Sequence, residues 1–291
     1  MASLKALRTR IASVKATRKI TKAQQMVAVS KLRRAQEAVA AARPYCEKMN
    51  AVIASVAAGA KSNPGAPKLL AGTGRDQVQL LIVATSDRGL CGGFNTNIVR
   101  YAKQKIEALK AANKTVKVLC IGRKGHDQLK RQYGDIIVDT FDFTSVRHIG
   151  FANADEIGKR LLAMFEDDEF DVATVVYSQF KSVISQVPTE MQLIPAALKD
   201  DDAAGPGTVY EYEPDESEIL SDLLPRNVSV QLFRILLENV AGEFGAKMTA
   251  MDGATRNAGD VIDKLTILYN RARKGKITNE LIEIISGAEA L

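Results

Sequence analysis

Hydrophobic residues near the end of the chain repeat with the spacing of a coiled coil. From Leu237 to Ala272 they follow one another at alternating intervals of four and three residues. This spacing keeps one apolar stripe facing a partner helix, so it predicts a left-handed coiled coil within a helix from about Arg226 to Glu289. The stripe consists of Leu237, Ala241, Phe244, Met248, Met251, Thr255, Ala258, Ile262, Leu265, Tyr269 and Ala272.

The beginning of the chain predicts a second long helix, over residues 1–60. Its apolar residues Leu4, Leu7 and Ile11 share one helical face, and Pro44 marks the place where we expect a kink. Each apolar stripe needs a partner, and the two long helices are at opposite ends of the sequence. We therefore expect them to pair antiparallel, with both chain ends near one tip.

Between the helices, apolar β-rich runs alternate with helical patterns, as in a mostly parallel sheet covered on both faces. The predicted fold class is therefore α+β. It combines a long antiparallel coiled coil of the N- and C-terminal helices (residues 1–60 and 212–291) with an inserted Rossmann-like α/β domain (residues 76–198). The predicted strands are Gln77–Ser86, Thr115–Gly122, Asp135–Phe143, Asp171–Phe180 and Gln186–Ile194, and the predicted helices are Asn95–Ala112, Lys124–Tyr133 and Ala152–Glu166.

Two stretches rich in Gly, Pro and polar residues predict connections between these parts. Lys61–Arg75 is expected to be a linker, and residues 199–225 a loop with some strand character at Thr208–Tyr212.

Charge is concentrated at the N-terminus. Residues 1–43 contain eleven Lys or Arg and one acid, Glu37, so this arm carries +10 while the whole chain carries +6. Such an arm indicates an anionic partner: nucleic acid, lipid headgroups or an acidic protein surface. A basic coiled-coil protein that binds nucleic acid is therefore one alternative, although few aromatic residues are available to stack on bases. No apolar stretch approaches the ~20 residues of a membrane span.

Catalytic and metal-binding patterns are not evident in the sequence. The glycine-rich loop from Ser86 to Asn95 joins a strand to a helix, as phosphate-binding loops do, but its spacing matches neither dinucleotide nor P-loop motifs. We interpret it as a tight turn that presents a contact surface, with a nucleotide-dependent enzyme as the alternative. His126 and His148, and the three isolated cysteines, have no metal-ligand spacing.

Three stretches resemble the γ subunits of rotary F-type ATP synthases. The C-terminal stretch carries Ile277, Thr278, Glu280, Glu283 and Ser286-Gly287-Ala288; the other two are Arg10–Ala23 and the loop Asp87–Asn95. One departure is Gln24, where relatives often carry Met. The inserted cysteine pair of chloroplast relatives is not present.

The resemblance implies a central rotor stalk, one copy inside three α and three β subunits, that also binds ε and the c-subunit ring. Mg-ATP or ADP and the catalytic chemistry would belong to β, so this chain would hold no catalytic residue, cofactor or metal, and would bind no nucleic acid. Membrane contact would be indirect, through the c ring. The location implied is the cytoplasmic face of a bacterial inner membrane, or alternatively the matrix side of the mitochondrial one.

The resemblance also implies which residues of this chain contact the partner subunits. Arg273 and Lys274 would face an acidic loop of β, while Thr278 and Glu280 would turn in an apolar sleeve. Arg88 and Cys91 would lie at the collar of the β ring. The basic pair Arg33 and Arg34 on the first helix would be a further contact for acidic groups.

Overall fold

The computed structural model describes residues 3–60, 67–196 and 216–289. The chain forms two compact units. We call residues 30–246 the central unit, and residues 1–29 with 247–291 the terminal unit. Each is described separately.

Two long helices, α1 (Leu4–Ala60) and α6 (Glu216–Glu289), carry the two ends of the chain. The helix α1 continues through Pro44 without ending. The helix α6 begins ten residues before its predicted start, so the loop predicted for residues 199–225 is wrong from Glu216 onward. Packing explains the difference: Leu220 and Leu224 are buried against α1 and outweigh the cost of Pro225. The strand character predicted at Thr208–Tyr212 lies outside the described residues.

The central unit contains a five-stranded sheet in the order β3-β2-β1-β4-β5. The first four strands are parallel, and β5 is antiparallel to β4. This confirms the predicted mostly parallel sheet, with strand ends within about two residues of those expected. The strands are β1 (Val78–Ala84), β2 (Thr115–Ile121), β3 (Ile137–Phe141), β4 (Val172–Phe180) and β5 (Gln186–Ile194).

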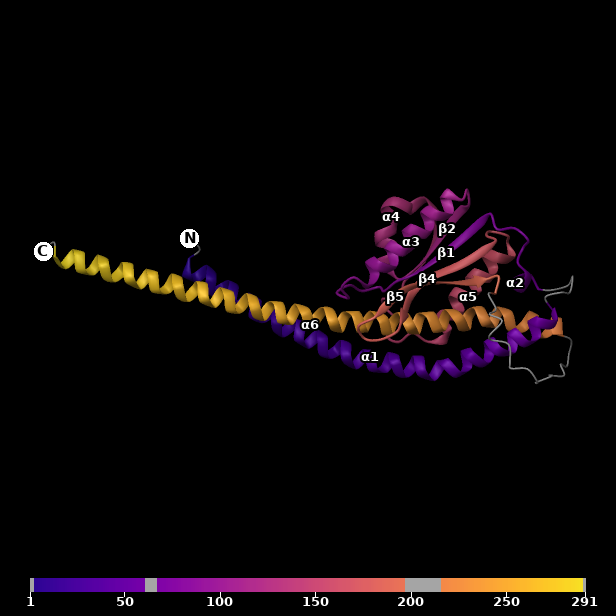
Figure 1. Cartoon of the computed structure of the whole chain (residues 1–291), viewed down its shortest axis with the longest axis horizontal. Coiled ribbons are helices and arrows are strands. Elements are labelled where there is room, and N and C mark those ends of the chain that lie inside the picture. The colour runs from indigo at the N-terminus through magenta and orange to yellow at the C-terminus, as the bar shows by residue number, and fades with distance from the viewer. Residues whose placement is uncertain (1–2, 61–66, 197–215, 290–291) are drawn as a thin grey trace. The chain divides into compact units, whose positions relative to one another are not determined.

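Helices cover both faces of this sheet, as Figure 1 shows. One face packs on α3 (Phe94–Ala111) and α4 (Arg123–Tyr133), which a short 3-10 helix (Gly134–Ile136) follows. The other face packs on α5 (Phe151–Glu166) and on the central part of α6. Alternate residues of each strand therefore face different helices, and the strands read as nearly continuous apolar runs.

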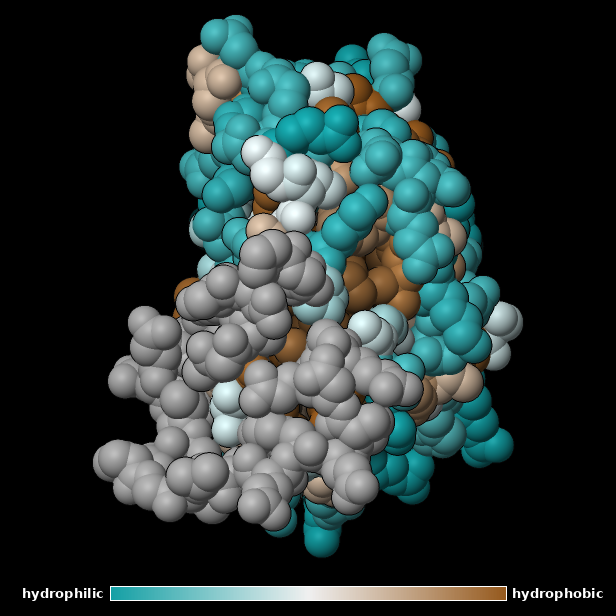
Figure 2. All heavy atoms as spheres, turned by 90° about the vertical axis from the view of Figure 1, so that its right-hand side faces the viewer, coloured by the Kyte–Doolittle hydropathy of each residue, from teal (hydrophilic) through white to brown (hydrophobic). Residues whose placement is uncertain are grey.

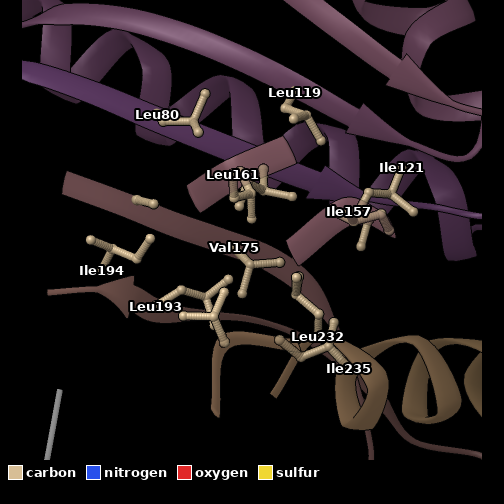
Figure 3. Close-up of a cluster of buried hydrophobic side chains, with 14 of the residues drawn as sticks. Leu80, Leu119, Ile121, Ile157, Leu161, Val175, Leu193, Ile194, Leu232 and Ile235 are labelled. Atoms are coloured by element: carbon tan, nitrogen blue, oxygen red, sulfur yellow. The ribbon is translucent and has the colours of Figure 1, made fainter. Parts of the chain in front are cut away.

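The larger apolar core lies between the sheet, α5 and α6 (Figure 3). Leu80 of β1 and Val175 of β4 meet Ile157 and Leu161 of α5, while Leu232 of α6 closes the cluster. Each of these side chains is at most 1% exposed. Because α6 supplies part of this core, it is a structural member of the α/β fold as well as a coiled-coil helix.

Besides the cores on the two faces of the sheet, a smaller apolar core lies at the end of the central unit that contains α2 (Lys68–Ala71). The predicted linker Lys61–Arg75 therefore includes one turn of helix. Leu70 of α2 is buried with Ile53 of α1 and Leu220 of α6. From this end, hydrophobic residues gather near the middle of the view between hydrophilic ones (Figure 2).

Within each unit, α1 and α6 run antiparallel. In the central unit Asn50 pairs with Gln231 at 2.7 Å, and Lys31 lies 5.2 Å from the ring of Phe244. Residues later in α1 thus contact residues earlier in α6, which confirms the predicted antiparallel orientation.

In the terminal unit the same pairing is largely polar. Thr21 and Thr255 share a hydrogen bond of 2.8 Å, Gln25 donates to Asp252 at 3.0 Å, and Arg8 donates to the hydroxyl of Tyr269 at 3.0 Å. The predicted stripe faces inward here, since Met251, Ala258, Ile262 and Leu265 are buried.

As predicted, the start of α1 and the end of α6 lie toward the same end of the terminal unit, but they are not level with each other. The last turns of α6 extend beyond the start of α1 (Figure 1). From Asn270 to Ala288 no side chain in the described helix is buried. The helix α6 has 74 residues and α1 has 57, so their lengths cannot match.

Candidate partner-contact surfaces

The unpaired end of α6 exposes a band of large apolar side chains. Five isoleucine or leucine residues there are 49–68% exposed, although such side chains favour burial. A contiguous exposed apolar surface on a helix marks a contact with a partner. The band consists of Ile277, Leu281, Ile282, Ile284 and Ile285.

The four residues predicted as contacts on this helix are all solvent-accessible. Arg273 and Lys274 are exposed and have no described ion pair. The Thr278 hydroxyl donates to the Lys274 carbonyl oxygen at 3.0 Å, and Glu280 lies 3.4 Å from Lys276. The structure therefore leaves two cations beside the apolar band, available to a partner.

A second exposed apolar group lies on α1 in the terminal unit, and sequence reasoning missed it. Ile20, Met26, Val27 and Val29 are 47–66% exposed, whereas Ala28 beside them is buried. The available signal was that these residues are apolar all around the helix rather than along one stripe. Such a helix is expected to be surrounded by other protein.

Arg33 and Arg34 lie on α1 in the central unit, and both are exposed. Arg33 is paired with Glu37 at 3.1 Å, one turn along the same helix. An exposed pair of this kind contributes less than about 1 kcal/mol, so it does not prevent Arg33 from binding another carboxylate.

The glycine-rich loop between β1 and α3 lies at the carboxyl edge of the sheet. Its backbone is interlocked with the turn after β2: Gly125 donates its N–H to the Thr85 hydroxyl at 2.7 Å, and Lys124 donates to the Ser86 carbonyl oxygen at 3.1 Å. Gly122 has a φ of +89°, and a Cβ there would lie 2.4 Å from the Thr85 carbonyl oxygen. Only glycine fits at that position.

Arg88 and Cys91 of this loop have opposite surroundings. Arg88 is exposed, and one of its guanidinium nitrogens donates to the Thr144 carbonyl oxygen at 3.4 Å. Cys91 is only 2% exposed, and its sulfur accepts a hydrogen bond from Asn95 at 3.2 Å. The side chain of Cys91 therefore supports the loop from within, while Leu90 next to it is 62% exposed. Sequence reasoning missed Leu90 and Asn95, although both belong to the motif.

Acidic and basic groups surround the base of the loop. The Asp87 carboxylate accepts the Arg123 N–H at 2.9 Å. Burial raises the pKa of Asp87 even though this N–H opposes the rise, and the nearby Asp142 adds to it. Hydrogen bonds from Thr144 lower the pKa of Asp142. These hydrogen bonds fix the turn.

No group of three or more His, Cys, Asp or Glu residues is arranged to hold a metal among the described residues. One described hollow, between α1 and α6 beside Cys46 and Glu238, measures about 40 Å³. That volume suits a few water molecules, whereas ligand pockets span roughly 300–1,000 Å³.

These features define a class of protein: two long helices pair antiparallel, carry an α/β insertion and expose apolar side chains along the helices. In the described residues, none of the helices combines the length and apolar character required to cross a membrane.

The family follows from comparison with known proteins. The sequence pattern of the family described as ATP synthase matches residues 3–291, and the chain belongs to that family. It is 64% identical over 295 residues to a protein of Parvibaculum lavamentivorans and 60% identical over 294 residues to one of Rhizobium leguminosarum bv. trifolii. Both are named ATP synthase gamma chain, and each alignment covers 100% of both proteins. The resemblance to γ subunits is thereby confirmed.

Solved structures show the same fold. A chain of the Euglena gracilis mitochondrial ATP synthase superimposes with a TM-score of 0.71 at 21% identity, over 99% of this chain and 94% of that one. A chain in the central stalk and c-ring structure of the Tetrahymena thermophila mitochondrial ATP synthase gives 0.60 at 25% identity, over 81% of this chain and 99% of that one.

Proposed function

We propose that this chain is the central stalk of a rotary ATP synthase and transmits rotation between a membrane ring of c subunits and the catalytic β subunits. The observation that carries the proposal is the band of exposed apolar side chains from Ile277 to Ile285. Such a surface is unfavourable in water and calls for a partner that surrounds the helix. Family membership identifies that partner class as the ring of α and β subunits.

The mechanism follows from symmetry. A single asymmetric helix pair inside a ring of three identical β subunits contacts each β differently. Each contact then favours a different conformation of β, with a different affinity for nucleotide. Turning the stalk exchanges these preferences among the three β subunits in sequence. Ion flow through the c ring would turn the stalk for synthesis, and hydrolysis would turn it in reverse.

Charged residues would add orientation to the apolar contacts. Arg273 and Lys274 are exposed cations beside the apolar band and would fit an acidic loop of β. Thr278 and Glu280 belong to the same exposed segment. Arg88, and through it the loop that Cys91 supports, would contact the lower part of β, and Arg33 with Arg34 would provide a further basic contact.

The chain would itself be non-catalytic and bind no cofactor, with Mg-ATP and ADP held by β. It would be a peripheral membrane protein on the cytoplasmic face of a bacterial inner membrane, attached through ε and the c ring. The alternative of a nucleic-acid-binding coiled coil has no support from the relatives, because those described above are ATP synthase chains.

Reconstitution tests this proposal. Purified α and β subunits are mixed with and without this chain, the products are separated by gel filtration, and Mg-ATPase activity is measured. We expect a complex with one copy of this chain for three α and three β, and turnover that requires the chain. If the chain elutes separately and activity does not change, the proposal is wrong, and binding of the basic arm to nucleic acid should be measured next.

A further inference from the structure

One buried side chain, Asn95, holds the turn between β1 and α3 together. It is 6% exposed and lies in the first turn of α3. Its Oδ1 accepts the N–H of Ser86 at 2.9 Å. Its Nδ2 donates to the Ser86 hydroxyl at 2.9 Å and to the Cys91 sulfur at 3.2 Å. Hydrogen bonds to this one amide therefore hold both the beginning of the turn, at Ser86, and its later part, at Cys91.

The Ser86 hydroxyl transmits this constraint to Arg88. The hydroxyl oxygen accepts a hydrogen bond from Asn95, and its single proton has two acceptors in reach, the Arg88 carbonyl oxygen at 2.7 Å and Asn95 Oδ1 at 3.1 Å, of which the Arg88 oxygen is the nearer. A hydrogen-bond chain thus runs from Asn95 through Ser86 to the backbone of Arg88.

Leu90, between the two anchored points, has an unusual backbone. Its φ is +66°, a region that residues with a Cβ seldom adopt unless their surroundings fix it. On either side of Leu90, hydrogen bonds hold the Arg88 carbonyl oxygen and the Cys91 sulfur. With both held, Leu90 and Arg88 are exposed at the surface of one turn.

We propose that Asn95 is a positioning residue for this turn. It fixes Arg88 and Leu90 as a combined cationic and apolar contact, which fits a protein surface where carboxylates border an apolar hollow. Asn95 itself touches no partner. The inference rests on the proposed function, in which the stalk's contacts with the ring carry the coupling.

Coupling in the assembled complex is the measurement that tests this role. Protons pumped per ATP hydrolysed are compared in membrane vesicles carrying the wild-type complex, Asn95→Ala or Thr96→Ala. Losing hydrogen bonds to a buried amide changes an equilibrium by about tenfold, so the fixed turn should be less populated in Asn95→Ala and pumping per ATP should fall. Thr96 is exposed on the same helical turn and serves as the matched control, with unchanged coupling expected.

A background lacking the contact separates positioning from general stability. In an Arg88→Ala, Leu90→Ala background, adding Asn95→Ala should lower coupling no further, although it should still lower the thermal midpoint of the complex. If coupling falls further in that background, Asn95 acts through something other than the turn, and the proposal is wrong.

A second variant covers the case in which Asn95→Ala prevents assembly. Ser86→Ala removes the hydroxyl that links Asn95 to the Arg88 carbonyl oxygen, while Asn95 keeps its hydrogen bonds with the residue-86 N–H and the Cys91 sulfur. It should reduce coupling in the same direction and also have no added effect in the double background; normal coupling in Ser86→Ala overturns the proposal.

The two proposals fail in different ways. If the wild-type chain forms no complex with α and β, the proposed function fails. If the wild-type complex forms and pumps, but Arg88→Ala with Leu90→Ala pumps equally well, only the positioning role fails.

Discussion

The central and terminal units place similar apolar side chains in opposite surroundings. Ile157 of the central unit is 0% exposed in the core between α5 and the sheet, whereas Ile284 of α6 is 68% exposed. The central unit buries large apolar clusters on both faces of its sheet. The terminal unit leaves such surface to a partner. The difference teaches that apolar side chains such as Ile157 stabilise the fold, whereas those such as Ile284 are left to stabilise a complex.

Replacing one isoleucine with alanine in each unit should test this difference most clearly. Ile157→Ala leaves a cavity and should lower the free energy of opening of the central unit by about 4 kcal/mol. Ile284→Ala should change it by less than about 0.5 kcal/mol. The readout is pulsed thiol labelling of Cys120, which is fully buried and whose pKa burial raises to about 12, so that it reacts only on opening.

The three cysteines all lie in the central unit and are buried, so labelling reports on that unit alone. Comparable acceleration of labelling in Ile157→Ala and Ile284→Ala would contradict the distinction between the buried core around Ile157 and the exposed surface around Ile284.

Gly122→Ala should have the next largest effect, because it strikes the point where two turns of the central unit interlock. The new Cβ would meet the Thr85 carbonyl oxygen at 2.4 Å in a left-handed backbone conformation. We expect a loss of about 3 kcal/mol from the combined clash and backbone strain. Urea unfolding of the full chain measures it, with Gly89→Ala as control, since a Cβ there meets nothing within 4 Å. Equal losses in the two variants would refute the interlocking role of Gly122.

How far the sequence predicts this structure depends on whether a feature is local. The strand β1 was predictable because its apolar run is continuous, and the seam from Met251 to Leu265 because it repeats. The helical start of α6 was not, since Leu220 and Leu224 gain their burial from α1, far away in the chain. For the same reason local spacing could not reveal that Cys91 points inward.

The contact residues show the same limit. Arg273 and Lys274 stand out in sequence because they interrupt an apolar pattern, and the structure leaves both exposed. Leu90 does not stand out, because its exposure depends on a positive φ and on hydrogen bonds from Asn95. Ile20 and Met26 lie off the helical stripe, and the structure shows both to be exposed.

Acid should weaken the central unit through Asp171, at the amino edge of the sheet. Burial raises the pKa of this carboxyl, but hydrogen bonds from the Val78 N–H and the Thr73 hydroxyl, together with the charge of Arg75, outweigh burial and leave the pKa lowered. A lowered folded-state pKa means that the stabilisation is present above the unfolded value of 3.8 and is lost as the pH falls below it.

Asp171→Asn should therefore cost about 2 kcal/mol at neutral pH, because it removes charge-assisted hydrogen bonds, and the cost should shrink toward pH 3. Urea unfolding of both proteins from pH 3 to pH 7 provides the test. A difference that stays constant over this range would show that the carboxylate charge does not contribute.

The smallest effect should come from the polar seam of the terminal unit, where Thr21 and Thr255 share a hydrogen bond. Thr21→Val or Thr255→Val alone leaves one hydroxyl without this partner and should cost about 1 kcal/mol. Replacing both with valine keeps the shape and removes both polar groups, so the double variant should be near neutral and the two effects strongly non-additive. Hydrogen exchange of α1 amides before Ser30 measures each variant. Additive losses would mean that the two hydroxyls do not stabilise each other, and that other contacts hold this part of the terminal unit together.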